Sequence, residues 1–343
     1  CINSLKSKKF NITILTNKNN KNDKELEYLD GIKVIRCKPF LKISRGFYSI
    51  DLIIKFFKIS KEYDVINLHL PITEIFPLLF FLKKNKTLIT YHCLPEFNYV
   101  AIFFKFFLYI LGIIAMFRAN TVLVLSKDYF KNINFHRMFS YKVIEIPPYI
   151  ENKNKVELVK TKNKYLRIGF LGRLSDEKGI ENLIKVSNKM YLKKFKHELL
   201  IAGNDKDQRF IKYINKLKKD SAHNKNIKFL GYLNETQKNN FFNKIDLFVL
   251  PSLNSFEAFG IVQLEAMSYG IPVLASNIYG VRSIIKNTGG GLLFQNNNTN
   301  DLFNKIISFK KDHFKSEDIK VNLNRFYNKK KFEKKIFDLF KSF

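Results

Sequence analysis

The feature that most constrains the fold is a series of short, uninterrupted apolar runs, rich in Val, Ile and Leu, that recurs along the whole chain. Strands buried on both faces of a parallel sheet have such runs, whereas strands with one face in solvent alternate between apolar and polar residues. Segments with helical spacing, such as 180–191 and 208–221, lie between the runs. Repeated strand–helix units of this kind predict an α/β fold with parallel sheets.

The runs fall into two sets of six, and 343 residues are enough for two domains with a core each. Residues 151–164 are polar, lysine-rich and without periodicity, which predicts a linker. We therefore expect a first domain over 1–150, a second over 165–325, and a C-terminal helix within 326–343. The predicted strands are 11–16, 32–36, 64–68, 87–91, 121–125 and 143–146, then 166–171, 198–202, 227–230, 247–250, 273–276 and 291–294.

The chain is strongly basic, with 60 Lys and Arg against 30 Asp and Glu, and the excess is spread over both halves. Such a charge predicts attraction to an anionic membrane surface or to phosphate-bearing substrates. No helix-turn-helix, zinc-finger or RNA-recognition pattern is present, so we expect no specific nucleic-acid partner. The three scattered cysteines indicate reduced thiols in a cytoplasmic protein, and no acidic cluster predicts a metal.

Residues 99–117 are apolar at nearly every position apart from Lys105 and Gly112. Three interpretations remain open: a buried crossover helix, a helix lying in the membrane interface, and a membrane span. A span fits poorly, because the runs at 87–91 and 121–125 are expected in one sheet and the segment between them must return to the same side.

The most informative stretch is 251–276, PSLNSFEAFGIVQLEAMSYGIPVLAS. It follows a predicted strand, and Phe259 and Gly260 begin a short helix. Gly260 has no side chain, so a ligand can come close to the backbone. The free amides of Gly260, Ile261 and Val262 would point out of the helix N-terminus, which predicts a binding site for a diphosphate.

Two glutamates flank this predicted phosphate site: Glu257 in the loop before the helix and Glu265 within it. Carboxylates accept hydrogen bonds from vicinal hydroxyl groups, so the arrangement suggests a nucleotide sugar, with one carboxylate facing the sugar and the other the ribose. Either glutamate alone would more simply be a solvated charge. Gly270 and Pro272 are expected to end the helix.

A second motif, GFLGRLSDEKG, spans residues 169–179. Gly172 is placed at the carboxyl end of a predicted strand, where α/β folds bind ligands. Arg173 offers a planar fork and Lys178 a mobile point charge on either side of a tight turn. This pair is suited to a diphosphate.

Together, the two motifs resemble glycosyltransferase family 4. The resemblance lies in two glutamates separated by seven residues, in the F-G pair and E-A-M-x-x-G-x-P-V string around them, and in a G-R-L-x-x-x-K-G segment. It implies two Rossmann-like domains facing across a cleft (the GT-B fold), a nucleoside-diphosphate sugar as donor, and retention of configuration. It also implies that Arg173 and Lys178 neutralise the leaving diphosphate.

Several shorter strings extend the resemblance, although turn chemistry alone explains each of them. Gly203, Gly231 and Tyr232 resemble family turns that surround the nucleoside base, and 289–293 resembles a G-x-G-L-L turn. The final helix, at 331–340, resembles one that packs back on the first domain.

In the first domain, His92 ends a predicted strand and resembles a family histidine that reaches toward the donor sugar. His69 is a second candidate, and a purely structural role remains open for both histidines. Ser126 resembles a V-S turn of the family, although a helix N-cap explains it equally well.

Two departures from the family pattern stand out. Residues 147–151 read P-P-Y-I-E in place of P-N-G-V-D, so the hinge turn lacks its glycine. The chain also opens inside what the resemblance places as the helix after the first strand. That strand and its glycine-rich loop, near donor and acceptor, are therefore expected to be missing.

We therefore expect a metal-independent glycosyltransferase with no cofactor. The resemblance implies that it retains configuration and that the leaving phosphate itself accepts the acceptor's proton. The expected donor is a UDP- or GDP-sugar, and the expected acceptor a lipid-linked or cell-surface glycan, such as a lipopolysaccharide or another polysaccharide. We expect a peripheral position on the cytoplasmic membrane face. The alternatives are a non-catalytic nucleotide-sugar-binding remnant and, less favoured, a nucleotide-sugar epimerase of the same fold.

Overall fold

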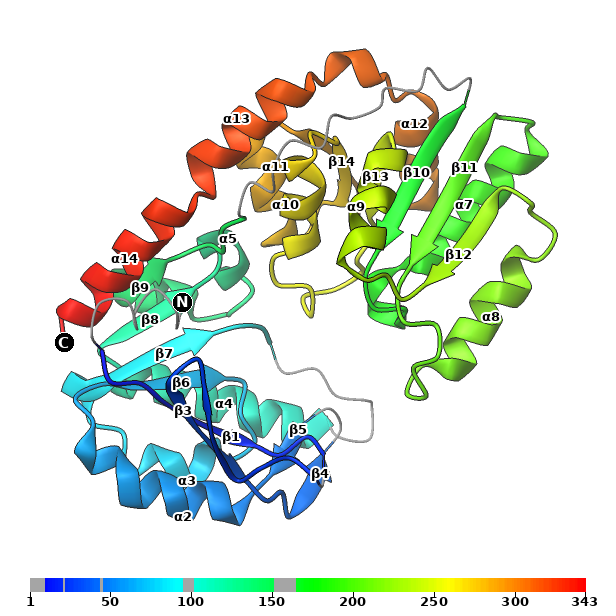
Figure 1. Ribbon diagram of the computed structural model, residues 1–343. Helices are drawn as coiled ribbons and strands as arrows, with labels where there is room; N and C mark the ends of the chain where they lie inside the picture. Colours follow the sequence, from blue (N-terminus) through cyan, green and yellow to red (C-terminus); the bar gives the residue numbers. More distant parts are fainter. Residues whose placement is uncertain (1–9, 21, 44–45, 95–101, 151–164) are drawn as a thin grey trace. The chain divides into compact units, whose positions relative to one another are not determined.

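The computed structural model describes residues 10–20, 22–43, 46–94, 102–150 and 165–343, and its chain divides into two compact units. The first unit comprises Cys1–Pro147 together with Lys330–Phe343, and the second comprises Pro148–Lys329. Both are built from parallel strands and crossover helices (Figure 1), which confirms the predicted α/β architecture with two Rossmann-like domains.

The second unit contains one six-stranded parallel sheet in the order β12-β11-β10-β13-β14-β15. Helices follow the strands in strict alternation (Figure 1). Its elements are β10 (Leu166–Leu171), η5 (Asp176–Lys178), α7 (Ile180–Leu192), β11 (His197–Ala202), α8 (Ile211–Ser221), β12 (Ile227–Gly231), α9 (Glu235–Lys244), β13 (Leu247–Leu250), α10 (Ile261–Ser268), β14 (Val273–Ser276), α11 (Val281–Thr288), β15 (Gly291–Phe294), α12 (Thr299–Ile307), η6 (Lys311–His313) and α13 (Ser316–Phe326).

This strand order determines where the second unit can bind a ligand. Numbered within the unit, it is 3-2-1-4-5-6, the order of a dinucleotide-binding sheet. The direction of winding reverses between β10 and β13, which pair through Ile168 and Gly169. At such a switch point, the loops at the carboxyl ends of the two strands diverge to opposite faces and leave room for a ligand between them.

The core of the second unit explains why its strands read as continuous apolar runs. Ile168, Phe170, Leu199, Ile201 and Val249 are all at most 1% exposed, because helices cover both faces of the sheet. Buried residues of α7 and α12 join the same cluster.

The strands of the first unit lie in three sheets, and the largest is the parallel sheet β6-β7-β8-β9. A three-stranded sheet β1-β3-β2 has β1 parallel and β2 antiparallel to β3, and β4 and β5 form a hairpin. The elements are β1 (Thr13–Asn17), β2 (Leu26–Leu29), β3 (Ile32–Cys37), β4 (Leu41–Ile43), β5 (Gly46–Tyr48), α2 (Ile50–Ile59), η1 (Ser60–Glu62), β6 (Ile66–Leu70), α3 (Ile75–Leu79), η2 (Lys84–Lys86), β7 (Thr87–Tyr91), α4 (Ile102–Arg118), β8 (Thr121–Val124), α5 (Lys127–Phe130), α6 (His136–Phe139), η4 (Ser140–Lys142), β9 (Val143–Glu145) and α14 (Lys329–Lys341).

The C-terminal helix α14 packs on the sheet of the first unit. Its Ile336 and Leu339 form a buried cluster with Leu88 of β7, Leu123 of β8 and Ile146. This contact explains why Lys330–Phe343 belong to the first unit, although they follow the second in sequence.

Helix α4 is the segment for which the sequence left three interpretations open, although residues 99–101 lie outside the described residues. It is a crossover helix, because it connects the parallel neighbours β7 and β8. Its burial is one-sided: Leu111 and Met116 are buried, whereas Phe106 is 63% exposed. Within the described part of the chain, no helix combines the length and apolar character needed to cross a membrane.

Candidate functional site

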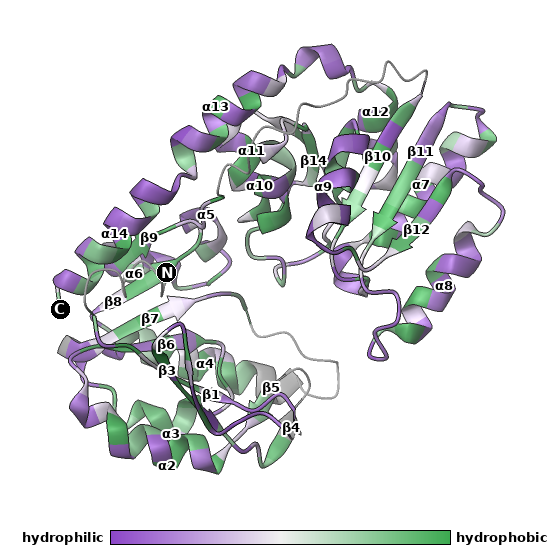
Figure 2. Cartoon of the chain, viewed as in Figure 1, coloured by the Kyte–Doolittle hydropathy of each residue, from purple (hydrophilic) through white to green (hydrophobic). Residues whose placement is uncertain are grey.

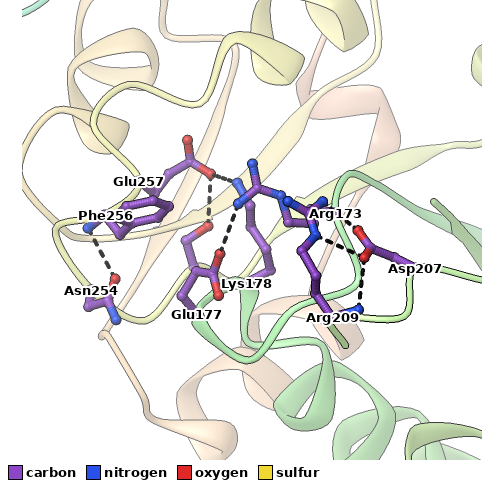
Figure 3. A network of polar contacts seen from close by, with 9 residues as sticks. Arg173, Glu177, Lys178, Asp207, Arg209, Asn254, Phe256 and Glu257 are labelled. Carbon is purple, nitrogen blue, oxygen red and sulfur yellow. Dashed lines mark hydrogen bonds and ion pairs between the residues drawn. The ribbon is translucent and has the colours of Figure 1, made fainter. Parts of the chain in front are cut away.

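The candidate site is formed by two loops of the second unit that meet at its switch point. One loop follows β10 and carries Arg173 and Lys178, and the other follows β13 and carries Glu257. These are the two motifs singled out in the sequence, and the sheet order brings them together although 79 positions separate Lys178 from Glu257. Figure 3 shows their side chains converging.

Backbone contacts hold the two loops against each other. The Leu253 amide donates to the Glu177 carbonyl at 2.9 Å. Gly179 has a φ of 67°, and a Cβ there would lie 2.0 Å from the Pro251 carbonyl oxygen. Only glycine fits such an approach, so position 179 fixes how closely the loops meet.

The Lys178 ammonium group forms an ion pair with the Oε2 atom of Glu257. The Ser252 hydroxyl group donates to the same oxygen at 3.3 Å. The two charged side chains are only 19% and 12% exposed. Because a partly desolvated charge pair is screened less by water than a surface pair, its geometry is better defined.

Arg173 stands at the open side of this group. Its guanidinium lies 3.6 Å from the Glu177 carboxylate, which is 5% exposed, while the Arg173 side chain is 44% exposed. Burial and a hydrogen bond with Glu177 raise the pKa of the neighbouring Asp176. Because it contacts the buried Glu177 carboxylate, the Arg173 guanidinium is held along one edge, and its exposed part stays accessible to a ligand.

The structure adds a cation that the sequence analysis missed. Arg209, in the loop after β11, binds Asp207 through two hydrogen bonds of 2.9 and 2.6 Å. These bonds, with a further contribution from Arg173, lower the pKa of Asp207 to about 2. Figure 3 draws the Asp207–Arg209 pair together with Arg173. The sequence did offer one signal for Arg209, its place in the loop after β11 and Gly203. An exposed charge in a loop, however, has no hydrophobic periodicity that would mark it as part of a site.

The start of helix α10 has the conformation expected of a backbone anion site. Gly260 has a φ of 77°, and a Cβ there would lie 2.6 Å from Leu250 Cδ2. No side chain caps the helix, so its first amides are not satisfied in that way. Phe259 is 3% exposed and packs edge-on against Tyr327, whereas Ile261, the first helical residue, is 48% exposed. Val262 follows it in the same turn.

Glu265 has different neighbours from Glu257. Its carboxylate lies 3.5 Å from Lys238 of α9, which also pairs with Glu235 at 3.0 Å. The two glutamates of the motif are thus held by two separate lysines. Gly270, with a φ of 71°, follows the end of α10 as predicted.

Three of the glycines assigned to the donor site lie at the ends of neighbouring strands: Gly172 directly after β10, Gly203 directly after β11, and Gly231 as the last residue of β12. The Gly172 amide donates to Ala202 and the Gly203 amide to Gly231, at 3.0 and 2.9 Å. A Cβ at Gly203 would lie 2.1 Å from the Gly172 carbonyl oxygen. The strand ends therefore form a continuous strip of backbone next to the Arg173 loop, and Tyr232 lies beyond it, 75% exposed.

The histidines of the first unit form a chain of hydrogen bonds. His69 Nδ1 and His92 Nε2 are 2.8 Å apart, and the rings stack with their centroids 5.0 Å apart. The Asn67 side chain donates from Nδ2 to His69 Nε2 at 3.2 Å, and its Oδ1 accepts from the Thr90 hydroxyl at 2.8 Å. This network assigns the His69 proton to Nδ1, and hence the His92 proton to its own Nδ1.

The surroundings of both imidazoles favour the neutral form. Removal of water by the surrounding protein, and repulsion from His92, lower the pKa of His69 to about 4, although part of that residue still faces solvent. Burial likewise lowers the pKa of His92. Ser126 has the N-cap role: its hydroxyl accepts from the Tyr129 amide at 3.3 Å.

Comparison with known proteins identifies a matching family for the second unit and several relatives of the chain. A model of the family described as Glycosyl transferases group 1 matches residues 151–325. The uncharacterized glycosyltransferase MJ1607 of Methanocaldococcus jannaschii is 35% identical over 123 residues, which are 36% of this chain and 30% of that protein. CapM of Staphylococcus aureus, a capsular polysaccharide biosynthesis glycosyltransferase, is 25% identical over 217 residues, 59% of this chain and 56% of CapM. The matches thus span less than two thirds of either relative.

Solved structures resemble the chain over most of its length. Sucrose-phosphate synthase from Thermosynechococcus elongatus matches 98% of this chain and 90% of its own, with a TM-score of 0.78 and 18% identity. Anabaena HepE, in complex with UDP and glucose, matches 91% of this chain and 87% of its own, with a TM-score of 0.68 and 16% identity. At these identities the likeness shows the fold, which is that of the GT-B glycosyltransferases.

Proposed function

Because this chain belongs to the glycosyl transferases group 1 family, we propose that it is a retaining, metal-independent glycosyltransferase of family 4. It moves a sugar from a UDP- or GDP-sugar to a lipid-linked or cell-surface polysaccharide acceptor. The observation that carries the proposal is the convergence of Arg173, Lys178 and Glu257 at the switch point of the second unit. The capsular function named for CapM and the UDP and glucose bound to HepE support the acceptor and donor classes.

The cations of the site serve the leaving group. When the bond between the sugar and the diphosphate breaks, negative charge grows on the phosphate oxygens, and fixed positive groups lower the energy of that state. The half-exposed guanidinium of Arg173, the ammonium of Lys178 and the uncapped amides of α10 supply this charge.

The two glutamates bind hydroxyl groups at the two ends of the donor. The Lys178 and Ser252 contacts both use Oε2 of Glu257, so Oε1 is the oxygen we assign to a sugar hydroxyl. Glu265 on α10 is assigned to the ribose, with Lys238 orienting its carboxylate. Each assignment places a charge-assisted hydrogen bond on a different part of one ligand.

The transfer needs no protein base in this proposal. The acceptor hydroxyl attacks from the same face that the diphosphate leaves, and a phosphate oxygen takes the proton as the new glycosidic bond forms. His92, neutral and carrying its proton on Nδ1, is assigned to a hydroxyl of the donor sugar.

The test combines a binding measurement with a product analysis. Isothermal titration with UDP, GDP and their hexose conjugates should show binding of one nucleotide series. Proton NMR of the product should show the anomeric configuration of the donor. A chain that binds the nucleotide sugar, but neither hydrolyses it nor transfers its sugar to any member of a glycan panel, would favour the non-catalytic remnant. A product of inverted anomeric configuration would disprove retention.

A further inference from the structure

Three neighbouring helices of the first unit each present an apolar stripe to the solvent. Figure 2 shows the strongly apolar character of this helix layer. The exposed fractions of these side chains run from 38% to 66%. We call this set the phenylalanine face; it consists of Ile50, Ile54 and Phe57 on α2, Phe76 on α3 and Phe80 directly after it, and Phe106, Phe107, Ile110, Ile114 and Phe117 on α4.

Helical spacing shows that each stripe is a designed face and not scattered exposure. On α4 the exposed pair Phe106 and Phe107 is followed by exposed residues every three or four positions, at 110, 114 and 117, while Leu108, Leu111 and Met116 pack inward. Residues at this spacing lie on one side of a helix. The outer side of α4 is therefore as apolar as the side that covers the sheet.

Ring contacts join the stripes of α3 and α4 into one surface. Phe76 lies 6.3 Å from Phe107 and 5.6 Å from Phe80 between ring centroids. Phe57 of α2 contacts Phe81, the second residue after α3, at 3.7 Å between centroids. Contiguous exposed apolar surface of this extent marks a contact with a membrane or another macromolecule.

Basic side chains gather along one edge of this face. The C-terminal ends of α2, α3 and α4 lie where β6, β7 and β8 begin, because each helix runs antiparallel to the strand that follows it. Glu62 and Asp64 are exposed at the same edge but are outnumbered. The exposed basic residues there are Lys58, Lys61, Lys83, Lys84 and Arg118.

We propose that the phenylalanine face docks on a bilayer containing anionic phospholipid, with its rings among the acyl chains and its basic edge at the headgroups. The proposal rests on the proposed function, in that a lipid-linked acceptor brings the reaction to a membrane. A net charge of +30 selects the occupant, because it repels a second copy of this chain and attracts an anionic surface.

The test is flotation of the chain with vesicles of phosphatidylcholine alone or mixed with phosphatidylglycerol. The wild-type chain should float with the anionic vesicles, and less so at high salt. Phe80→Ser combined with Phe106→Ser should weaken this binding about tenfold or more, because each ring loses its burial in the bilayer. The matched control, Leu192→Ser with Val321→Ser, removes equally exposed apolar groups from the second unit and should leave binding unchanged.

A charge variant separates the two parts of the proposal. Lys83→Gln with Lys84→Gln should weaken binding to the anionic vesicles, whereas Lys310→Gln with Lys315→Gln in the second unit should not. Equal binding to both lipid compositions would overturn the anionic part. Vesicle binding by the phenylalanine variant at the wild-type level would overturn the docking surface. A wild-type chain that binds no vesicles but forms a dimer, and a variant that is a monomer, would overturn it as well. Titration with UDP tests the proposed function separately. A wild-type chain that binds UDP but no vesicles would reject this inference and leave the proposed function standing.

Discussion

The two units share one architecture but present different surfaces. In the second unit, helix α8 buries Ile214 and Leu217 and turns four exposed lysines to the solvent: Lys212, Lys216, Lys218 and Lys219. In the first unit, α4 covers its sheet in the same way but turns phenylalanine and isoleucine outward. The strand–helix repeat therefore fixes the sheet, while the outer face of each helix is free to serve a different partner.

The difference also separates two kinds of recognition. The second unit concentrates charge in loops at the strand ends, where the proposed function has single groups meet a small anionic ligand. The first unit offers apolar area, to which each side chain adds a similar amount. Substitutions in the loops should therefore have large and specific effects on the reaction, and substitutions on the helix faces should leave the reaction itself intact.

The largest effect is expected for the phosphate-binding cations. Arg173→Ala and Lys178→Ala should each lower kcat/KM by about 2–4 kcal/mol in transition-state free energy, because each removes a charge that stabilises the leaving diphosphate. The control is Lys185→Ala on α7, which removes an exposed cation paired with Glu181. Steady-state kinetics that place either variant level with Lys185→Ala would take that residue out of the phosphate site.

The glutamates should differ from each other. Glu265→Ala is expected to weaken UDP binding by about 1.5–3 kcal/mol, the usual contribution of a hydrogen bond to a charged group. Glu257→Ala should leave UDP binding nearly intact and lower turnover of the UDP-sugar. Isothermal titration and initial rates measure the two quantities, and an equal loss of UDP affinity in both variants would contradict the assignment.

Two glycines with similar backbone angles can separate the cost of steric overlap from the cost of backbone strain. Gly260→Ala and Gly289→Ala both place a side chain at positive φ, 77° and 65°, but only the first meets neighbouring atoms. Gly260→Ala should therefore cost about 1–3 kcal/mol more stability than Gly289→Ala. It should also weaken UDP binding, which Gly289→Ala should not. Denaturant unfolding and UDP titrations of both variants give the comparison. Equal free energies of unfolding would mean that the atoms around Gly260 move to accommodate the methyl group.

The histidine pair should make the first unit sensitive to acid. The folded pKa of His69 is about 4, below the ordinary value of 6.5, so the unfolded chain takes up the proton first as the pH falls. Stability should therefore decrease from about pH 6.5 toward pH 4, and His69→Asn should reduce that decrease. Denaturant midpoints at several pH values test this, with the imidazole NMR signal of His69 as a direct reading. A His69 signal that titrates near 6.5 would refute it.

The smallest effect is expected from metal removal. EDTA should leave turnover unchanged, because Arg173, Lys178 and the start of α10 meet the phosphate charge in the proposed mechanism. The measurement is the initial rate before and after dialysis against EDTA. A rate that falls, and that Mg²⁺ or Mn²⁺ restores, would show that the protein groups do not suffice.

The sequence was most informative where burial is two-sided. The bounds of β10, β13 and β14 agree with the prediction, because each is a mainly apolar run between turn residues. The strand β2 and the hairpin of β4 and β5 were not predicted. Three of the four residues of β2 are exposed, and without an inward face no apolar pattern marks a strand.

The site was predictable as motifs but not as contacts. Spacing along the chain placed Lys178 and Glu257 after strands, yet their ion pair depends on β10 and β13 being neighbours, which hydropathy does not determine. The pairing of Glu265 with Lys238 depends in the same way on how α9 packs beside α10. The exposed side of α4 was equally hidden, because a helix that is apolar all round gives no sign of which side its neighbours cover.

The close approach at Gly179 has a consequence for how this protein can change. A Cβ there would fall on the Pro251 carbonyl oxygen, and the Leu253 amide is bonded to Glu177 across the same gap. Insertions or deletions at 177–179 or 251–253 would therefore separate the two loops and, with them, Lys178 from Glu257. The tip at 254–256 has its own local bonds, since the Phe256 amide donates to the Asn254 side chain at 3.0 Å and the Glu257 amide donates to the Asn254 carbonyl at 3.3 Å. Engineered libraries for new donor sugars should accordingly vary the side chains of that tip and keep its length, and the close approach at Gly179, constant.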